Sequence, residues 1–207
     1  PQYRVRGRFR GALMPWLREH IWPEEAAFSD REHARSEAGI FLAALAGAGT
    51  TTAAVFGSPH PHGATALLEA SPPLPWTCGG PALMDREGPP ELLCEPSEAD
   101  RAMRELRHRF GDRLVVTPRF AVSSTEAQLA LCGALAREAD LRVQTHLSEN
   151  PDEIALVARQ FPECRDYLEV YERAGLVGPR TLLAHAVHCS DGAFGRIAAA
   201  GAWIVHC

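Results

Sequence analysis

The sequence predicts an α/β fold in which a parallel sheet carries helices on its faces. Short apolar segments alternate with helical segments along the 207 residues, which is the order that parallel sheets require. The apolar fraction of 46% is large enough for a substantial core. About six strand–helix units are expected, and the length suits one domain or one large part of a domain.

The first half of the chain begins with an irregular, arginine-rich segment before a helix expected at 13–20. A second helix is expected at 30–48, because Ser29 and Asp30 supply a capping signal and Gly47 ends the helical pattern. The other elements expected here are a buried strand at 50–56, a loop with Pro59 and Pro61, a short helix near 64–70, a proline-rich linker at 72–75, a weaker strand at 76–84, a helix at 98–110 and a strand at 114–117.

The second half carries clearer signals for helix starts. A helix at 124–139 is expected after Ser123, and Glu126 places a carboxylate in its first turn. Asn150 predicts an N-cap and Pro151 a first-turn proline for a helix that ends at residue 160. The remaining expected elements are strands at 141–146, 181–185 and 202–206, and helices at 167–174 and 191–200.

The composition argues against several classes of function. The formal net charge is −5 and no basic run occurs, which argues against nucleic acid as a partner. All 21 basic residues are arginine, so a lysine Schiff base and a P-loop lysine are excluded. The six cysteines form no C-x-x-C pair, and no apolar run approaches the length of a membrane span. We therefore expect a cytoplasmic protein that does not bind membranes.

Polar residues that could carry chemistry stand where the predicted strands end, as active groups do in (β/α) barrels. His146 ends the strand at 141–146, where a neutral imidazole can bind a metal ion. Glu149 follows three residues later, and its carboxylate could take a proton from water and return it to a leaving group. The alternative is a hydrogen-bonded core histidine beside a helix-start acid, and the H-x-x-E spacing alone does not decide between the two.

Two further strand ends carry candidates. His185 ends the strand at 181–185 and could bind metal, orient water or stabilise developing negative charge, unless it is a satisfied core histidine. Arg119 and Phe120 follow the strand at 114–117. A guanidinium can donate to a carbonyl oxygen, and a phenyl ring can stack on a flat heterocycle. The alternative is a surface arginine beside a core phenylalanine, and we favour this alternative slightly over the functional interpretation.

His60 and His62 form an H-x-H pair, a spacing that is common for two metal ligands on one strand. They lie in a loop with two prolines, which break the strand geometry that such ligands need. We therefore favour a non-ligating role for both. His188 is expected in a loop as well.

Several segments resemble guanine deaminases of the amidohydrolase superfamily. Gly-Thr-Thr-Thr at 49–52 and His-Ala-Val-His at 185–188 are shared widely in that superfamily, whereas Thr-Pro-Arg-Phe at 117–120 and His-Leu-Ser-Glu-Asn at 146–150 are more specific to guanine deaminases. Further matches occur in the family's order at Pro1-Gln2, Trp16-Leu17, Trp22-Pro23-Glu24, Leu83-Met84-Asp85, Asp152-Glu153-Ile154 and residues 167–171.

The resemblance implies a zinc-dependent TIM-type (β/α)8 barrel that hydrolyses guanine to xanthine and ammonia in purine catabolism. It implies that His146 is a zinc ligand, that Glu149 is the proton shuttle, and that His185 steadies the activated hydroxide. A homodimer is also implied. The implied substrate-binding residues are Gln2, Arg119, Phe120, His146 and Glu149.

The resemblance also implies an incomplete barrel domain, with about strands 2 to 7 of the eight within residues 1–207. The family's first-strand H-x-H pair is expected just before Pro1, and its last-strand aspartate after Cys207. We therefore expect the first and last strands and the family's β-sandwich to lie outside this chain. With one zinc ligand and two open sheet edges, the isolated chain is expected to bind zinc weakly and to associate.

Two alternatives stay open. One is a deaminase or chlorohydrolase of another heterocycle on the same fold, which the presence of Arg119 and Phe120 disfavours. The other is a non-catalytic remnant with a scaffolding role. The expected absence of zinc ligands favours a remnant, whereas the retention of the candidate catalytic residues together disfavours it.

Overall fold

The computed structural model describes residues 1–8, 13–70 and 74–207. Strands and helices alternate along the chain, and all strand pairs are parallel. This arrangement confirms the predicted α/β fold with parallel strands. The expected arginine-rich start lies partly outside the described residues, at 9–12, and so does the expected proline-rich linker, at 71–73.

The strands form two parallel groups. In the described part of the chain, β1 pairs with β2, and β3 to β7 follow one another in chain order in a five-stranded sheet. The strands are β1 (Thr52–Phe56), β2 (Trp76–Gly80), β3 (Ala82–Leu83), β4 (Val115–Pro118), β5 (Arg142–Leu147), β6 (Thr181–His185) and β7 (Trp203–Val205).

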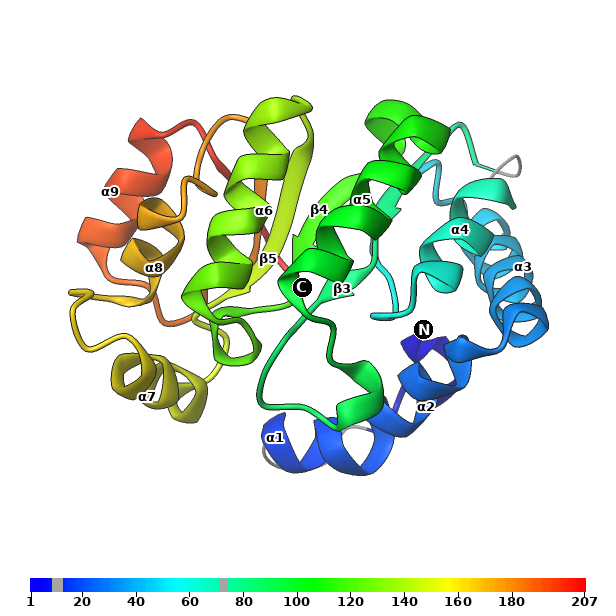
Figure 1. Ribbon diagram of the computed structural model, residues 1–207, viewed down its shortest axis with the longest axis horizontal. Coiled ribbons are helices and arrows are strands. Elements are labelled where there is room, and N and C mark those ends of the chain that lie inside the picture. Colours follow the sequence, from blue (N-terminus) through cyan, green and yellow to red (C-terminus); the bar gives the residue numbers. More distant parts are fainter. Residues whose placement is uncertain (9–12, 71–73) are drawn as a thin grey trace.

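Helices cover the strands from one side, and α1, α2 and α7 lie together along one edge of the molecule (Figure 1). The α-helices are α1 (Leu13–Trp16), α2 (Trp22–Ala26), α3 (Arg31–Gly47), α4 (Pro61–Glu69), α5 (Pro96–Phe110), α6 (Glu126–Glu138), α7 (Pro151–Gln160), α8 (Tyr167–Arg173) and α9 (Asp191–Ala199). A π-helical turn, η2 (Leu17–Ile21), joins α1 to α2, and the other short helical turns are η1 (Gln2–Val5), η3 (Ala27–Ser29), η4 (Pro90–Leu92), η5 (Gly111–Arg113) and η6 (Ala121–Ser123).

The expected single strand at 76–84 was wrong, because Pro81 divides it into β2 and β3. Proline has no N–H to donate to a strand ladder, and the chain changes partner there: β2 pairs with β1, whereas β3 pairs with β4. The two groups of strands meet at a bridge between Gly79 and Leu114. A Cβ atom on Gly80 would lie 1.9 Å from the carbonyl oxygen of Val115, so this close approach requires glycine.

The helix expected near 64–70 begins earlier, at Pro61. Its first position tolerates proline because the N–H there needs no partner within the helix. The helix expected at 13–20 continues through η2 and α2 to Ala26. The cap signals were informative elsewhere: the side chains of Asp30, Thr125 and Asn150 each accept a hydrogen bond from a first-turn N–H group.

The main core lies between the central strands and the helices that cover them. Val116, Leu147 and Leu183, from β4, β5 and β6, are fully buried, and Leu129 of α6 and Tyr171 of α8 are buried against the same core. Parallel strands buried on both faces are typically apolar throughout. The core therefore fixes the carboxyl ends of β4, β5 and β6 relative to one another.

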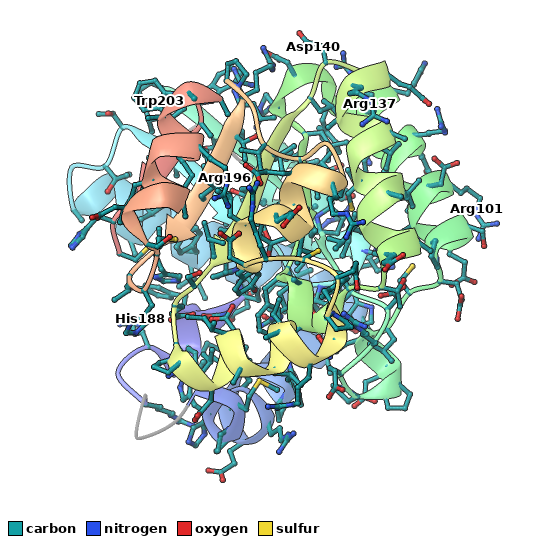
Figure 2. All side chains as sticks on the ribbon, turned by 90° about the vertical axis from the view of Figure 1, so that its left-hand side faces the viewer. Arg101, Arg137, Asp140, His188, Arg196 and Trp203 are labelled. Atoms are coloured by element: carbon teal, nitrogen blue, oxygen red, sulfur yellow. The ribbon has the colours of Figure 1, made fainter. Side chains whose placement is uncertain are left out.

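The last strand differs from the central ones. All three residues of β7 are exposed, and the side chain of Trp203 is 65% exposed. Trp203 lies at the surface in the side view (Figure 2). Among the described residues, no helix is long and apolar enough to cross a membrane.

Candidate active site

The six residues singled out in the sequence surround one cavity of about 250 Å³ at the carboxyl ends of the strands. Arg119 and Phe120 follow β4, His146 and Glu149 come from the end of β5, and His185 ends β6. Gln2 reaches the cavity from η1, and the other lining residues are Leu13, Trp16, Leu17, Phe56, Ala184 and Cys207. Residues far apart in the sequence thus form one site.

His146 is held in a form that can bind a metal ion. Its Nδ1 lies 2.7 Å from the carbonyl oxygen of Arg119. Because a carbonyl only accepts, Nδ1 carries the proton and the lone pair remains on Nε2. Burial lowers the pKa of His146 to about 3, so the imidazole is neutral at physiological pH. A neutral imidazole with one nitrogen anchored is the usual state of a histidine metal ligand.

His185 and Glu149 lie beside His146. The rings of His146 and His185 are stacked with their centroids 5.3 Å apart, and His185 Nε2 lies 3.6 Å from Glu149 Oε2. The ring of Phe56 also contacts His146, at a centroid distance of 4.4 Å. A base, a second histidine and a neutral imidazole are therefore within reach of one small ligand.

Unusual backbone conformations place these side chains. His185 and Ala186 have φ angles of 74° and 52°, and Ser148 has a φ angle of 49°. Residues other than glycine rarely adopt this left-handed region, and such strain concentrates at functional sites. The N–H of Ala186 donates to the carbonyl of Leu147 at 2.8 Å, and that of His188 donates to Ser148 at 3.0 Å. These bonds join the two strand ends that carry Glu149 and His185.

A buried carboxylate supports the loop that carries Glu149. Glu153 is 1% exposed, and its Oε2 accepts the N–H groups of Glu149 at 3.1 Å and Asn150 at 3.2 Å. Its Oε1 accepts the hydroxyl of Tyr167 at 2.6 Å. Tyr171, beside Tyr167, donates its hydroxyl to the carbonyl of His146 at 2.7 Å. Burial raises the pKa of Glu153 to about 7.

A second buried carboxylate supports the opposite wall. Glu25 of α2 is 1% exposed, and its Oε2 lies 2.5 Å from Nη1 of Arg119. Its Oε1 accepts from the side-chain amide of Gln2 at 3.5 Å. Sequence reasoning missed Glu25 and the supporting role of Glu153. Glu153 lies in the matching segment Asp152-Glu153-Ile154, and Glu25 directly follows the segment Trp22-Pro23-Glu24, but the pattern does not show which acid is buried.

The described residues supply only part of a metal site. They contain no group of three or more histidine, cysteine, aspartate or glutamate side chains placed to hold a metal ion, whereas catalytic zinc sites use three protein ligands. His146 fits one such ligand. His60 precedes α4 and His62 lies within it, and neither lines the cavity. His188 is exposed in a loop (Figure 2).

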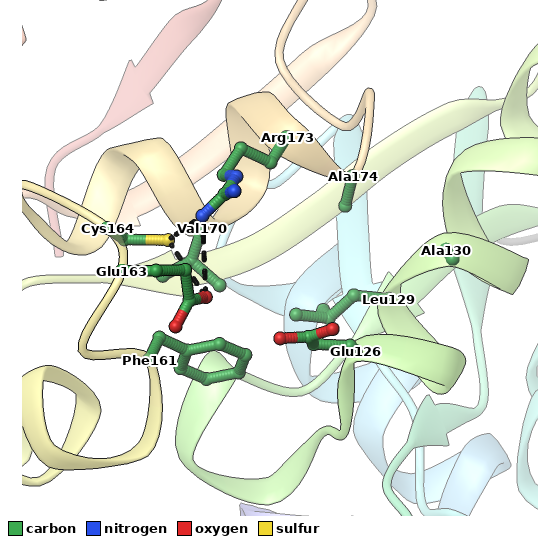
Figure 3. Close-up of a pocket in the computed structure, with 9 residues that line it drawn as sticks. All are labelled: Glu126, Leu129, Ala130, Phe161, Glu163, Cys164, Val170, Arg173 and Ala174. Carbon is green, nitrogen blue, oxygen red and sulfur yellow. Dashed lines mark hydrogen bonds and ion pairs between the residues drawn. The ribbon is translucent and has the colours of Figure 1, made fainter.

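Another cavity of about 220 Å³ lies between α6, α8 and the loop before α8 (Figure 3). Nη1 of Arg173 lies 3.4 Å from Sγ of Cys164 and 3.4 Å from Oε1 of Glu163. Burial raises the pKa of the Cys164 thiol, which argues against a reactive thiolate. None of the six candidate residues lines this cavity.

The fold and the site together define the class of protein. The chain belongs to the amidohydrolase family, which matches residues 2–207. A probable guanine deaminase of Deinococcus radiodurans is 43% identical over 216 residues, which cover 100% of this chain and 48% of that protein.

Solved structures agree with the sequence comparison. The crystal structure of guanine deaminase from Bradyrhizobium japonicum has a TM-score of 0.96 and 38% identity, and the match covers 100% of this chain and 46% of that one. Guanine deaminase from C. acetobutylicum with bound guanine in the active site has a TM-score of 0.90 and 32% identity, with coverages of 94% and 48%. The chain spans about half the length of these relatives.

Proposed function

We propose that the protein containing this chain is a zinc-dependent guanine deaminase, which converts guanine and water to xanthine and ammonia in purine catabolism. The observation that carries the proposal is the meeting of His146, Glu149, His185, Arg119 and Phe120 around one cavity. The similarity to guanine deaminases over the whole chain supports the choice of substrate.

The wall of the cavity suits a flat, neutral purine. Arg119 offers N–H donors, and Gln2 offers both a donor and an acceptor. Phe120 is buried beside them and offers an apolar ring for contact with the heterocycle. Polar groups at one edge and an apolar face are the usual composition of a site for a small aromatic ligand.

Glu149 is the proposed proton shuttle. During deamination a water oxygen forms a bond to the amino-bearing ring carbon, and the bond from that carbon to the exocyclic nitrogen breaks. The water loses two protons: one must reach the ring nitrogen beside the attacked carbon, and the other must reach the departing amine, which leaves as ammonia. The Glu149 carboxylate lies in the cavity and can carry each of these protons in turn. His185, 3.6 Å from Glu149, is placed to stabilise charge that develops on the attacking oxygen.

Zinc, with His146 as one ligand, would supply Lewis-acid activation of the attacking water. The hydrogen bond from Nδ1 of His146 to the Arg119 carbonyl supports this assignment, because it leaves Nε2 as the coordinating atom. The remaining ligands would come from the first and last strands of a complete (β/α)8 barrel.

The six described cysteines are all free thiols, which supports the proposed cytoplasmic location. The proposed partner is a small purine rather than a nucleic acid. A homodimer stays a prediction.

The proposal is tested by assaying the protein, expressed from its complete reading frame, with guanine, adenine, cytosine and ammelide. Guanine is the expected substrate. Glu149→Gln is expected to lower the rate by about 10²–10⁴-fold, since it removes the proton carrier, while metal content measured by atomic absorption stays unchanged. Glu163→Gln, a carboxylate of the second cavity, is the matched control. Turnover of another ring without turnover of guanine would contradict the proposal.

A further inference from the structure

Glu25 is a buried acid that touches the substrate wall without lining the cavity. Its carboxylate contacts two cavity-lining side chains, Arg119 through Oε2 and Gln2 through Oε1. It belongs to α2, whereas Arg119 follows β4, 94 residues later in the chain. The contact is therefore formed only when the fold brings these elements together.

The bond to Glu25 completes the fixation of Arg119. The main chain of Arg119 is already held at both ends, since its N–H donates to Leu83 at 3.1 Å and its carbonyl accepts from His146 Nδ1. The side chain is 7% exposed, and its Nη1 is committed to Glu25. A planar guanidinium with one fixed nitrogen presents its other N–H groups in set directions.

The same carboxylate orients Gln2. The side-chain amide has a donor end and an acceptor end, and its Nε2 is turned toward Glu25. The carbonyl end, Oε1, is then the polar atom left for a ligand. One acid thus fixes a donor and an acceptor on the same wall.

The ion pair between Glu25 and Arg119 also affects which ligand charge the cavity favours. An arginine without a counter-charge would favour an anionic ligand, whereas Glu25 cancels the charge of Arg119 within the wall. A buried ion pair contributes little net stability because desolvation offsets the Coulomb attraction. Stability alone therefore gives little reason for this pair, and a role in orientation accounts for it better.

We propose that Glu25 is a positioning residue that sets the hydrogen-bond polarity of the purine pocket. It holds Arg119 as a donor and Gln2 as an acceptor. This arrangement selects a ring edge with a carbonyl acceptor next to an N–H donor, as in 6-oxopurines, over the reversed edge of a 6-aminopurine. The inference rests on the proposed function and identifies the residue behind its substrate preference.

The test compares guanine with 2,6-diaminopurine, whose 6-amino group and unprotonated N1 reverse the polarity of that edge. In the protein from its complete reading frame, Glu25→Gln is expected to lower kcat/KM for guanine by about 10–100-fold, mainly through KM. The kcat/KM for 2,6-diaminopurine is expected to change by less than about 3-fold. Its donor and acceptor already mismatch those of Arg119 and Gln2, so it gains nothing when Glu25 holds these side chains in place. Glu24→Gln, the adjacent acid, is the matched control and is expected to preserve the ratio.

A cycle of variants separates positioning from a structural role. In a background that carries both Arg119→Gln and Gln2→Ala, adding Glu25→Gln is expected to leave the ratio between the two purines unchanged, because Glu25 acts only through these two side chains. An equal loss for both purines in the single variant, or a further loss of selectivity when Glu25→Gln is added to that background, would overturn the proposal. If Glu25→Gln does not fold, Glu25→Asp keeps the charge, and a selectivity loss of about 3-fold or more is then required.

Failure of the proposed function would be recognised separately. It would show as a lack of guanine turnover in the unmodified protein. The effect of Glu25→Gln is then measured by calorimetric binding of the same two purines. Loss of preference for guanine supports the positioning role, and an unchanged preference overturns it.

Discussion

Glu25 and Glu153 are both 1% exposed, and each lies behind one wall of the same cavity. They differ in the groups that their carboxylates contact. Glu25 faces the guanidinium of Arg119 at 2.5 Å. Glu153 has neutral partners, which are two main-chain N–H groups and the hydroxyl of Tyr167. The first acid therefore belongs to an ion pair, whereas the second depends on hydrogen bonds alone.

This difference has a consequence for protonation. Hydrogen bonds favour the charged carboxylate, but burial without a counter-charge favours the neutral acid. For Glu153 burial dominates and raises its pKa to about 7. The two acids also position different parts of the site. Glu25 holds side chains that line the proposed purine site, and Glu153 holds the main chain that carries Glu149.

The largest expected effect on stability comes from removing the arginine of the ion pair between Glu25 and Arg119. Arg119→Met leaves Glu25 as a buried charge without the counter-charge of Arg119, and we expect a loss of about 3–5 kcal/mol in the free energy of unfolding. Urea denaturation measures this loss. The double variant Arg119→Met with Glu25→Gln is expected to recover most of it, because no charge is then left unpaired. A single variant that loses less than about 1 kcal/mol would show that Glu25 does not depend on Arg119.

A slightly smaller effect is expected from the acid that has no counter-charge. The pKa of Glu153 is about 7 in the folded protein and 4.5 in the reference state. Because the folded-state pKa is raised, the protonated Glu153 side chain contributes to stability. This contribution is fully present below pH 4.5 and is lost as the pH rises through 7. Its size is about 3 kcal/mol.

The measurement is the free energy of unfolding of the protein and of Glu153→Gln between pH 5 and pH 8. The variant keeps a neutral side chain at all these values, so its stability is expected to fall less across this range. Parallel curves for the two proteins would contradict the raised pKa.

The smallest expected effect on stability comes from removing one of the neutral hydrogen-bond donors to Glu153. Tyr167→Phe removes the hydroxyl that donates to Glu153 at 2.6 Å, and we expect a loss of about 1–2 kcal/mol in the free energy of unfolding. Thermal denaturation measures it. Tyr3→Phe, which removes a hydroxyl that contacts neither acid, is the control. Equal losses in both variants would show that the bond to Glu153 contributes nothing specific.

The sequence predicted the parts of the fold that depend on local signals. The caps at Asp30 and Asn150 and the apolar runs of β4 to β6 act within a few residues, so their elements were found nearly in place. The break at Pro81 was missed, because a change of strand partner depends on distant segments. The closed eight-stranded barrel stays a prediction.

The candidate site was predicted unevenly for the same reason. Side chains that follow strands share one edge of a parallel sheet, so the meeting of Arg119, His146 and His185 follows from the pattern. Glu25 contacts Arg119 from a helix far away in the chain, and no periodicity marks it as buried. The spacing of Asn150 and Glu153 is that of a capping box, which predicts the bond from the N–H of Asn150 to Glu153 but not the second bond, from the N–H of Glu149.

Arg119 serves the two halves of the site with different parts of itself. Its side chain lines the cavity, while its carbonyl oxygen anchors Nδ1 of His146. Every amino acid has that carbonyl. Ligand recognition can therefore diverge by substitution at position 119, paired with a change at position 25, while the imidazole keeps its tautomer and orientation. A scaffold with this separation can acquire new substrates through few mutations without rebuilding its chemistry.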